Sequence, residues 1–250
     1  MIYITGDTHG DIDLYKLNSK FFKEGKKLTK NDYVIVCGDF ACCWDGGAFD
    51  KYIQNWYNEK PWTTLFVCGN HENFDLLDSY PVTEWNGGKV HKISDSIIHL
   101  MRGQVFTIDG KKIFTFGGAQ SHDMWHRKEG VSWWAREMPS DKEYEEGFRN
   151  LEAVDNKVDY VITHCAPDKV QDALFQWRHY EHDKLTNYLE IVRQTITFDH
   201  WCFGHYHDDN DIGTKYHCLY NNVIELGDYI FEVRGLKYGT DLIGDILSDV

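Results

Sequence analysis

Short apolar runs recur along the chain, and five of them lead directly into clusters of polar residues. The runs are rich in β-branched and aromatic side chains, which is typical of buried strands. We expect strands at 2–5, 33–37, 65–68, 160–162 and 201–203. The clusters that follow them are Gly6-Asp7-Thr8-His9, Gly38-Asp39, Gly69-Asn70-His71-Glu72, Thr163-His164 and Gly204-His205-Tyr206-His207. Ligands bind at the carboxyl ends of strands in α/β sheets, so these clusters are predicted to share one edge of a sheet.

The segments between the first three runs have the apolar spacing of helices. We expect helices at 11–24 and 48–59, and a shorter helix at 72–79. This alternation of strands and helices favours a parallel sheet with right-handed crossovers.

The pattern changes after residue 104. The runs 105–108 and 111–116 flank Asp109-Gly110, a dipeptide typical of the tight turn of a β-hairpin. Further helices are expected at 140–156 and 182–194, and further strands at 215–219, 222–226 and 229–233. The sequence therefore predicts an α/β fold in which two mixed β-sheets pack face to face and are flanked by helices.

A loop at about 119–139, the Trp-rich loop, has no clear period and is rich in Trp, His and Arg. A loop of this length in a compact domain is often functional, so it is a candidate lid. The alternative is a cap that packs on its own aromatic rings and leaves its Arg side chains at the surface. Five of its residues could contact a phosphate or stack on a ring: His122, Arg127, Arg136, Trp133 and Trp134.

Composition bounds the class of protein. With 250 residues, only four prolines and no low-complexity linker, residues 1–250 are expected to form a single domain carrying this lid or cap. The net charge of −14 counts against non-specific binding of long nucleic acids, which needs a basic surface. It leaves room for a small phosphorylated substrate, because bound metal ions can reverse the local field.

Cysteine usage and the N-terminus bear on the compartment. The chain has seven cysteines and no Cys-x-x-Cys pair, and several of them lie in or beside expected strands, where free thiols act as small core residues. The first residues begin a strand and have no signal-peptide pattern, and no apolar run approaches the roughly 18 residues of a membrane span. We expect a soluble, cytoplasmic protein with no membrane partner.

The chemistry of the polar clusters points to metal ions. Carboxylate, amide and imidazole groups form too large a set for one tetrahedral zinc but suit two divalent ions that share a carboxylate. Asp39 has two oxygens and could bridge them. Two divalent ions, two carboxylates and a bridging hydroxide leave a charge of about +1, which would attract a phosphate. The candidate ligands are Asp7, His9, Asp39, Asn70, His164, His205 and His207.

These motifs resemble the signature of the calcineurin-like metallophosphoesterase superfamily: Gly-Asp-x-His, Gly-Asp, Gly-Asn-His-Glu, a His, and Gly-His-x-His. Every block occurs in order between Gly6 and His207, so the resemblance covers most of the chain. It implies two packed sheets flanked by helices, with the site at the sheet ends. By motif position it implies one metal on Asp7, His9, Asp39 and His207, and a second on Asp39, Asn70, His164 and His205.

The resemblance places His71 beside the metals without ligating them. Its ordinary pKa lies near neutrality, so we expect it to donate a proton to the leaving oxygen or to stabilise charge on the phosphoryl group. Asp75 could orient its other ring nitrogen.

Two departures refine the resemblance. The protein serine/threonine phosphatases of the superfamily carry Arg after the second motif and just before the third, whereas here these places read Gly38-Asp39-Phe40-Ala41-Cys42-Cys43-Trp44 and Val67-Cys68-Gly69-Asn70. Phosphoprotein phosphatase activity is therefore not expected. The segment 117–137 looks similar to a bacterial and phage-type branch of the superfamily.

The leading hypothesis is hydrolysis of a phosphate ester by a hydroxide that bridges two divalent ions, with a phosphodiester or a small phosphomonoester as substrate. The donor set suits Mn first, with Fe, Zn, Co, Ni or Mg as alternatives. Two other hypotheses stay open: a nuclease acting on short or single-stranded nucleic acid, and a non-catalytic scaffold with the same fold.

Overall fold

Two β-sheets pack against each other in the computed structural model, which describes residues 1–174 and 180–227. The first sheet has seven strands in the order β13-β1-β2-β3-β6-β5-β4. Their bounds are β1 Ile2–Thr5, β2 Tyr33–Val36, β3 Thr63–Phe66, β4 Val82–Trp85, β5 Gly88–Ser94, β6 Ile97–Leu100 and β13 Val223–Glu225. The second has six strands in the order β11-β12-β10-β9-β8-β7. Their bounds are β7 Gln104–Ile108, β8 Lys111–Phe116, β9 Tyr160–Thr163, β10 His200–Phe203, β11 Asn210–Ile212 and β12 Tyr216–Cys218.

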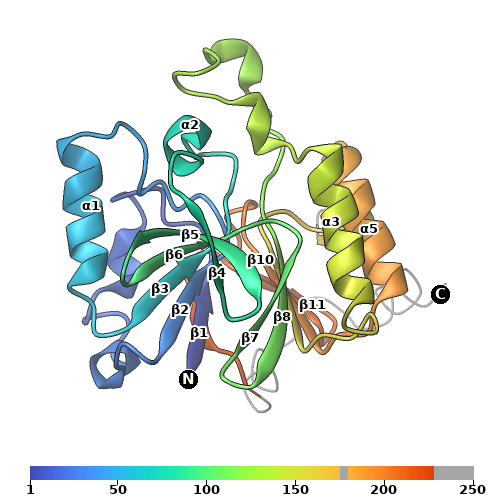
Figure 1. Ribbon diagram of the computed structural model, residues 1–250, viewed down its shortest axis with the longest axis horizontal. Helices are drawn as coiled ribbons and strands as arrows, with labels where there is room; N and C mark the ends of the chain where they lie inside the picture. The colour runs from blue at the N-terminus through green and yellow to red at the C-terminus, as the bar shows by residue number, and fades with distance from the viewer. Residues whose placement is uncertain (175–179, 228–250) are drawn as a thin grey trace.

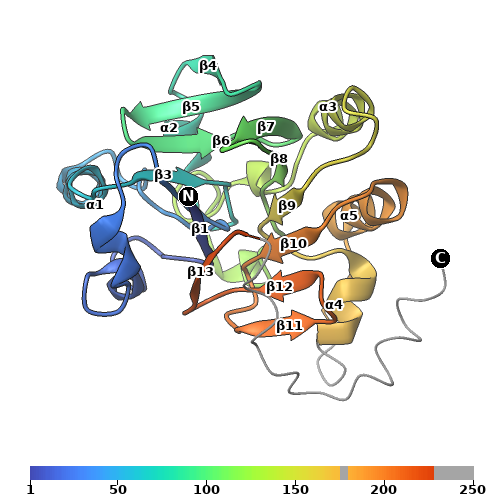
Figure 2. The ribbon, with the colours of Figure 1, turned by 90° about the horizontal axis from the view of Figure 1, so that it is seen from below.

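Helices cover the outer faces of both sheets (Figure 2). Packing contacts place α1 and α2 on the first sheet, and α3, α4 and α5 on the second. The α-helices are α1 Ala48–Asn58, α2 Phe74–Leu77, α3 Asp141–Glu152, α4 Asp168–Leu174 and α5 Lys184–Thr195. Short 3₁₀ turns are η1 Leu14–Leu17, η2 Glu24–Lys27, η3 Met124–His126 and η4 Ala135–Glu137. None of the helices within residues 1–174 and 180–227 is long and apolar enough to cross a membrane.

The central strands are mostly apolar because both of their faces are buried. In β1, Ile2 and Ile4 join the core between the sheets, whereas Tyr3 joins the core under the helices of the first sheet. In β3, Leu65 points inward and Phe66 outward in the same way. This alternation explains why the strands read as continuous apolar runs in the sequence.

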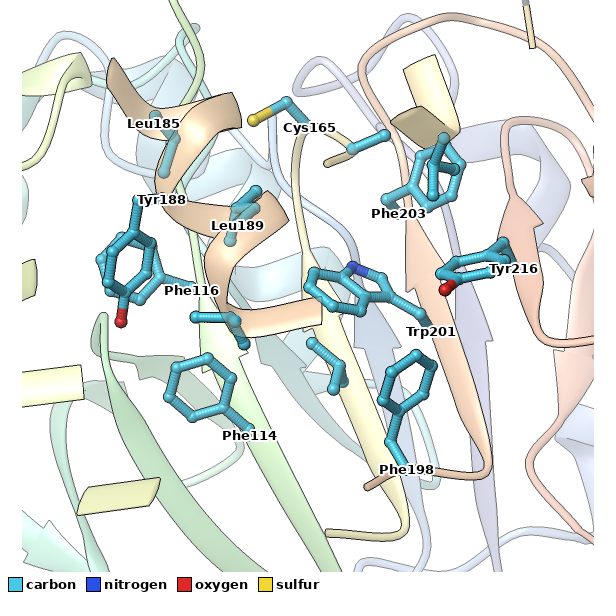
Figure 3. Packing of buried hydrophobic residues seen from close by; sticks show 14 of the residues in the cluster. Phe114, Phe116, Cys165, Leu185, Tyr188, Leu189, Phe198, Trp201, Phe203 and Tyr216 are labelled. Carbon is cyan, nitrogen blue, oxygen red and sulfur yellow. The ribbon is translucent and has the colours of Figure 1, made fainter. Parts of the chain in front are cut away.

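A third core lies between the second sheet and its helices (Figure 3). Leu185 and Leu189 of α5 face Phe114 of β8 and Trp201 of β10. Burial of these large side chains contributes roughly 1.5–3 kcal/mol each. The four layers therefore hold the sheet edges, and the loops that leave them, in fixed positions.

Most of the predicted elements are confirmed. Strands β1, β2 and β3 are parallel neighbours, as expected from the alternating pattern. Strands β7 and β8 form the predicted antiparallel hairpin, and its turn residues Asp109 and Gly110 both have positive φ, 51° and 77°. The predicted helices at 48–59, 72–79, 140–156 and 182–194 correspond to α1, α2, α3 and α5, and the strands predicted at 215–219 and 222–226 correspond to β12 and β13.

The helix predicted at 11–24 is wrong. The structure has only the 3₁₀ turns η1 and η2 there, and Asn18 between them is extended, with φ −77° and ψ 159°. Lys16 is buried and donates hydrogen bonds to backbone carbonyls of the turn after β1. These tertiary bonds outweigh a helical preference that is small for each residue.

Several elements had no clear signal in the sequence. The antiparallel strands β4 and β5, the short strand β11 and the helix α4 were not predicted, nor was β6, which pairs parallel to β3. The strand predicted at 229–233 lies outside the described residues. The Trp-rich loop contains η3 and η4 and projects beyond the sheets, at the top of Figure 1.

Candidate metal centre

The five polar clusters meet because five strands end at one side of the two packed sheets. Strands β1, β2 and β3 run parallel in the first sheet, and β9 and β10 run parallel in the second. The polar cluster of each strand begins within three residues of the last residue of that strand. The clusters do meet, but the prediction that a single sheet carries all five is wrong, because β9 and β10 belong to the second sheet.

The motif glycines leave room for ligand residues of other motifs. A Cβ atom on any of three glycines would collide with such a side chain, so no larger residue fits without displacing it. A Cβ atom would lie only 2.1 Å from His164 Nδ1 at Gly38, 2.0 Å from Asp39 Oδ1 at Gly69 and 2.1 Å from Asp7 Oδ1 at Gly204.

Four candidate ligands occupy the left-handed backbone region, which non-glycine residues rarely adopt. Their φ angles are 45° for His9, 46° for Asp39, 69° for His205 and 53° for His207. Such conformations cost roughly 1–3 kcal/mol each and cluster at functional sites. The turns after β1, β2 and β10 therefore hold these side chains against a local preference.

Asp39 lies at the centre of the site, 1 % exposed. Its Oδ2 is 3.3 Å from His9 Nε2, and its Oδ1 is 3.4 Å from His164 Nε2. Oδ1 also accepts a hydrogen bond from the backbone N–H of His71 at 2.7 Å. One carboxylate thus faces histidines on two sides, as a shared ligand must.

Asp7 is completely buried, and its two oxygens differ. Oδ1 accepts a hydrogen bond from the backbone N–H of His205 at 3.0 Å. Oδ2 has no hydrogen-bond partner, although His207 Nε2 lies 3.2 Å away and His9 Nε2 lies 3.9 Å away. A buried carboxylate oxygen without a donor is costly, and a cation between these three residues would satisfy it. The residues present therefore fit a divalent ion.

The second set of donors surrounds His164. Its Nδ1 donates to the backbone carbonyl of Cys37 at 2.7 Å, so in the neutral ring Nε2 carries the lone pair and faces Asp39. The Oδ1 of Asn70 lies 3.2 Å from the same Nε2. The ring of His205 lies 5.0 Å from that of His164, centre to centre.

Three groups of side chains could each hold an ion, because their ligand atoms lie within 4.8 Å of one another. Six of the sequence-predicted residues belong to these groups, whereas Asn70 and His205 lie beside them. The groups are Asp7, His9 and His207; His9, Asp39 and His71; and Asp7, Asp39 and His164.

Opposite charges at the site hold protons on His9 and His164 when metal is absent. Burial opposes the charged forms, but the Asp39 and Asp7 carboxylates raise the pKa of His9 and of His164 to about 9. Although burial alone would raise it, the pKa of Asp39 is held well below its usual range by His164 and His9. Burial and the charge of His164 lower the pKa of His205 to about 3. Metal ions binding here must therefore displace protons.

His71 contacts the Trp-rich loop rather than Asp75. Arg127 places Nη1 3.2 Å from His71 Nδ1 and Nη2 3.4 Å from His71 Nε2, while Asp123 holds the Arg127 Nε at 2.8 Å. Asp75 instead accepts a hydrogen bond from Trp134 Nε1 at 2.8 Å. The hypothesis that Asp75 orients the His71 ring is therefore wrong.

The remaining residues of the Trp-rich loop have divergent positions. The His122 ring lies 5.8 Å from that of His205, beside the site. Arg136 pairs with Asp75 and Asp78, away from His71. Trp134 is buried against Trp44, as in the alternative of a packed cap, whereas Trp125 is 79 % exposed.

Several residues that support the candidate ligands were not predicted from the sequence. Asp13 Oδ2 lies 2.7 Å from His9 Nδ1, which directs His9 Nε2 toward the site. The hydroxyl of Tyr220 donates to Asp13 at 3.1 Å, and its ring stacks on His207 at 4.8 Å. The four-residue spacing from His9 to Asp13 is a signal that could have been used. Tyr220 carries no such signal because it lies more than 200 residues from Asp13 along the chain.

Comparison with known proteins identifies the family. The calcineurin-like phosphoesterase family model matches residues 1–209, so the chain belongs to this family. Three curated relatives are lariat debranching enzymes. That of Xenopus laevis, enzyme A, is 28% identical over 137 residues, 49% of this chain and 24% of the relative. That of Danio rerio is 27% identical over 49% of this chain and 23% of the relative.

The third relative, from Caenorhabditis briggsae, is 29% identical over 135 residues, 48% of this chain and 25% of the relative. The chain therefore spans about a quarter of the length of the curated relatives that it matches.

Proposed function

We propose that this protein is a metal-dependent phosphoesterase that binds two divalent ions. One ion would be held by Asp7, His9, Asp39 and His207, and the other by Asp39, Asn70, His164 and His205. The position of Asp39 carries this proposal, because its two oxygens face His9 at 3.3 Å and His164 at 3.4 Å. Imidazole and carboxylate donors suit Mn first, with Fe, Zn, Co, Ni or Mg as alternatives.

The ions, when bound, would supply Lewis acidity toward phosphoryl oxygens and would lower the pKa of a water molecule that attacks phosphorus. The protein side chains then have two tasks, to orient the ester and to stabilise the charge on its departing oxygen. The buried carboxylates Asp7 and Asp39 fix the centre and cancel part of the added charge.

His71 is proposed to assist departure of the leaving group. Burial lowers the pKa of its imidazole, and the charges of Arg127 and His9 add to that effect while Asp39 opposes it. The ring is therefore neutral near pH 7, and its N–H can donate a hydrogen bond that stabilises charge on an oxygen of the ester.

Arg127 is proposed to bind a phosphoryl oxygen from the open side of the site. The chain has no Arg where the protein phosphatases of the superfamily carry it, and Arg127 brings a guanidinium to His71 from the Trp-rich loop. His122 lies beside His205 and is proposed to contact the substrate as well. The Trp-rich loop would then act as a lid over the site.

The substrate is proposed to be a phosphodiester or a small phosphomonoester. The names of the relatives refer to the debranching of lariats, which favours the nuclease among our alternatives. The exposed ring of Trp125 offers a surface for a base, whereas the net charge of −14 counts against long polymers. The scaffold alternative predicts lost ligands, yet every candidate ligand is present.

The test is hydrolysis of p-nitrophenyl phosphate and of bis-p-nitrophenyl phosphate after removal of metal and addition of Mn²⁺. We expect turnover that requires Mn²⁺, and turnover of the diester would lead next to oligonucleotides. Cleavage of single-stranded DNA that weakens as salt rises would support the nuclease. Two bound ions without turnover of any ester would contradict the catalytic proposal and favour the scaffold.

A further inference from the structure

The side-chain amide of Asn70 has a defined orientation in the site. Its Oδ1 lies 3.2 Å from His164 Nε2, and its Nδ2 donates to Ser121 Oγ at 3.2 Å. The two ends of an amide have nearly the same shape, but only the oxygen can ligate a cation. A neighbour must therefore favour the orientation that turns the oxygen toward the site.

Ser121 alone cannot set this direction, because a hydroxyl can donate or accept. Glu137 determines whether the Ser121 hydroxyl donates to Asn70 or accepts from it. Ser121 Oγ donates to Glu137 Oε2 at 2.7 Å, and the backbone N–H of Ser121 donates to Glu137 Oε1 at 2.7 Å. Burial raises the pKa of Glu137, while the two hydrogen bonds from Ser121 and the charge of Arg127 oppose that shift. In its ionised form the carboxylate accepts and does not donate, so the only hydroxyl proton of Ser121 is committed to it. Toward Asn70 the hydroxyl therefore offers a lone pair, and the amide must present Nδ2 to it.

The three residues form a buried chain of hydrogen bonds. Glu137 is completely buried, Ser121 is 2 % exposed and Asn70 is 6 % exposed. In such surroundings a wrongly turned amide would leave buried polar atoms without partners, which is unfavourable. The direction set by Glu137 is therefore strongly preferred.

Ser121 and Glu137 also lie at the two ends of the Trp-rich loop, which projects beyond the sheets in Figure 1. Arg102 also links the two ends of the loop, because its guanidinium donates hydrogen bonds to the backbone carbonyls of Gly117 and Glu137. The same loop carries Arg127, which contacts His71, the residue after Asn70. The loop thus contacts two consecutive residues of the third motif.

We propose that Glu137 is a positioning residue, which acts through Ser121 to hold the Oδ1 of Asn70 toward the second metal ion. This inference rests on the proposed function, since it assumes that Asn70 is a ligand. Ser121 and Glu137, at the two ends of the Trp-rich loop, then have a role in metal binding that is separate from any contact with the substrate.

The test uses Glu137→Gln, which keeps the size of the side chain. A glutamine amide can donate to Ser121 Oγ, and the freed hydroxyl proton can then point at Asn70 and favour the reversed amide. We expect isothermal titration of metal-stripped protein with Mn²⁺ to show one of two ions bound about 10- to 100-fold more weakly, with the other unchanged, as for loss of a partner that supports a ligand.

A double-mutant cycle separates positioning from general damage. Ser121→Ala should weaken the same ion, and the double variant Ser121→Ala with Glu137→Gln should be no weaker than Ser121→Ala, because both changes break one pathway. Glu146→Gln is the matched control. Glu146 lies on α3, away from the two ends of the Trp-rich loop, and pairs with Lys89 and Gln104. The affinities for both Mn²⁺ ions should therefore stay at the wild-type value.

Unchanged affinities in Glu137→Gln, equal weakening of both ions, or additive effects in the double variant would each overturn the inference. The melting temperature of each metal-free variant shows whether a loss of affinity comes from unfolding. Wild-type protein that binds fewer than two ions would contradict the proposed function itself, and that result is visible before any variant is made.

Discussion

Arg127 directs two guanidinium nitrogens at the imidazole of His71. The two ring nitrogens diverge within the ring plane, so two guanidinium nitrogens can lie 3.2 and 3.4 Å from them only by approaching from one face of the ring. The arrangement leaves the in-plane N–H of His71 directed toward other partners, among which a phosphoryl or leaving oxygen is the proposed one.

Removal of the His71 ring should separate metal binding from turnover. We expect His71→Ala to keep both ions and to lower kcat by about 10²-fold or more, as for loss of a hydrogen-bond donor that stabilises developing charge. Metal content by atomic absorption and kcat on the better p-nitrophenyl ester measure the two effects. Wild-type kcat in this variant would show that His71 has no part in the chemistry.

Removal of the Arg127 guanidinium should weaken the contact with the phosphate. Arg127→Ala is expected to lower kcat/KM roughly 10- to 100-fold, because a charge-assisted hydrogen bond is lost. Arg136→Ala is the matched control from the same loop, since Arg136 pairs with Asp75 and Asp78. If both variants lose the same activity, the loop as a whole matters and a specific role for Arg127 is excluded.

Loss of the Asp39 charge should disrupt both ions together. Asp39→Asn keeps the shape of the side chain but leaves Asp7 as the remaining carboxylate among the candidate ligands. We expect the affinity for Mn²⁺ to fall more than about 100-fold, which is beyond the range for residues that only support a ligand. Asp45→Asn, an exposed change on the loop that follows, is the control. Retention of two tightly bound ions by Asp39→Asn would argue against a shared carboxylate.

A histidine pair far from the candidate ligands predicts a loss of stability in acid. His91 and His99 are buried with their Nδ1 atoms 3.2 Å apart, and burial, together with the charges of His91 and Arg102, holds the pKa of His99 well below its usual value. The unfolded chain binds a proton at His99 below about pH 6.5 and the folded protein does not, so stability is present above that pH and falls as pH drops.

The expected loss from His99 alone is about 2 kcal/mol between about pH 7.5 and about pH 5. His99→Phe, which keeps a ring against Phe66, should remove this share of the pH dependence. Urea unfolding of both proteins at the two pH values provides the measurement. An identical pH dependence in both would mean that His99 is protonated in the folded state.

The sequence alone determined which residues are candidates for the chemistry. Strands buried on both faces must be apolar, so the polar residues that end them stand out, and the ends of neighbouring parallel strands must meet. For that reason Asp7, Asp39 and His164 could be placed together from the pattern before any contact was known. The same logic predicted the two sheets and most of their helices.

Tertiary structure decided which other side chains reach those residues. Ser121 and Glu137 approach Asn70, and Tyr220 approaches His207, across long stretches of sequence whose local pattern says nothing of distance. The contact of His71 with Arg127 instead of Asp75 has the same origin. Local periodicity encodes strands and helices, because it follows from burial of one face, whereas contacts between loops depend on how the whole core sets the positions of their ends.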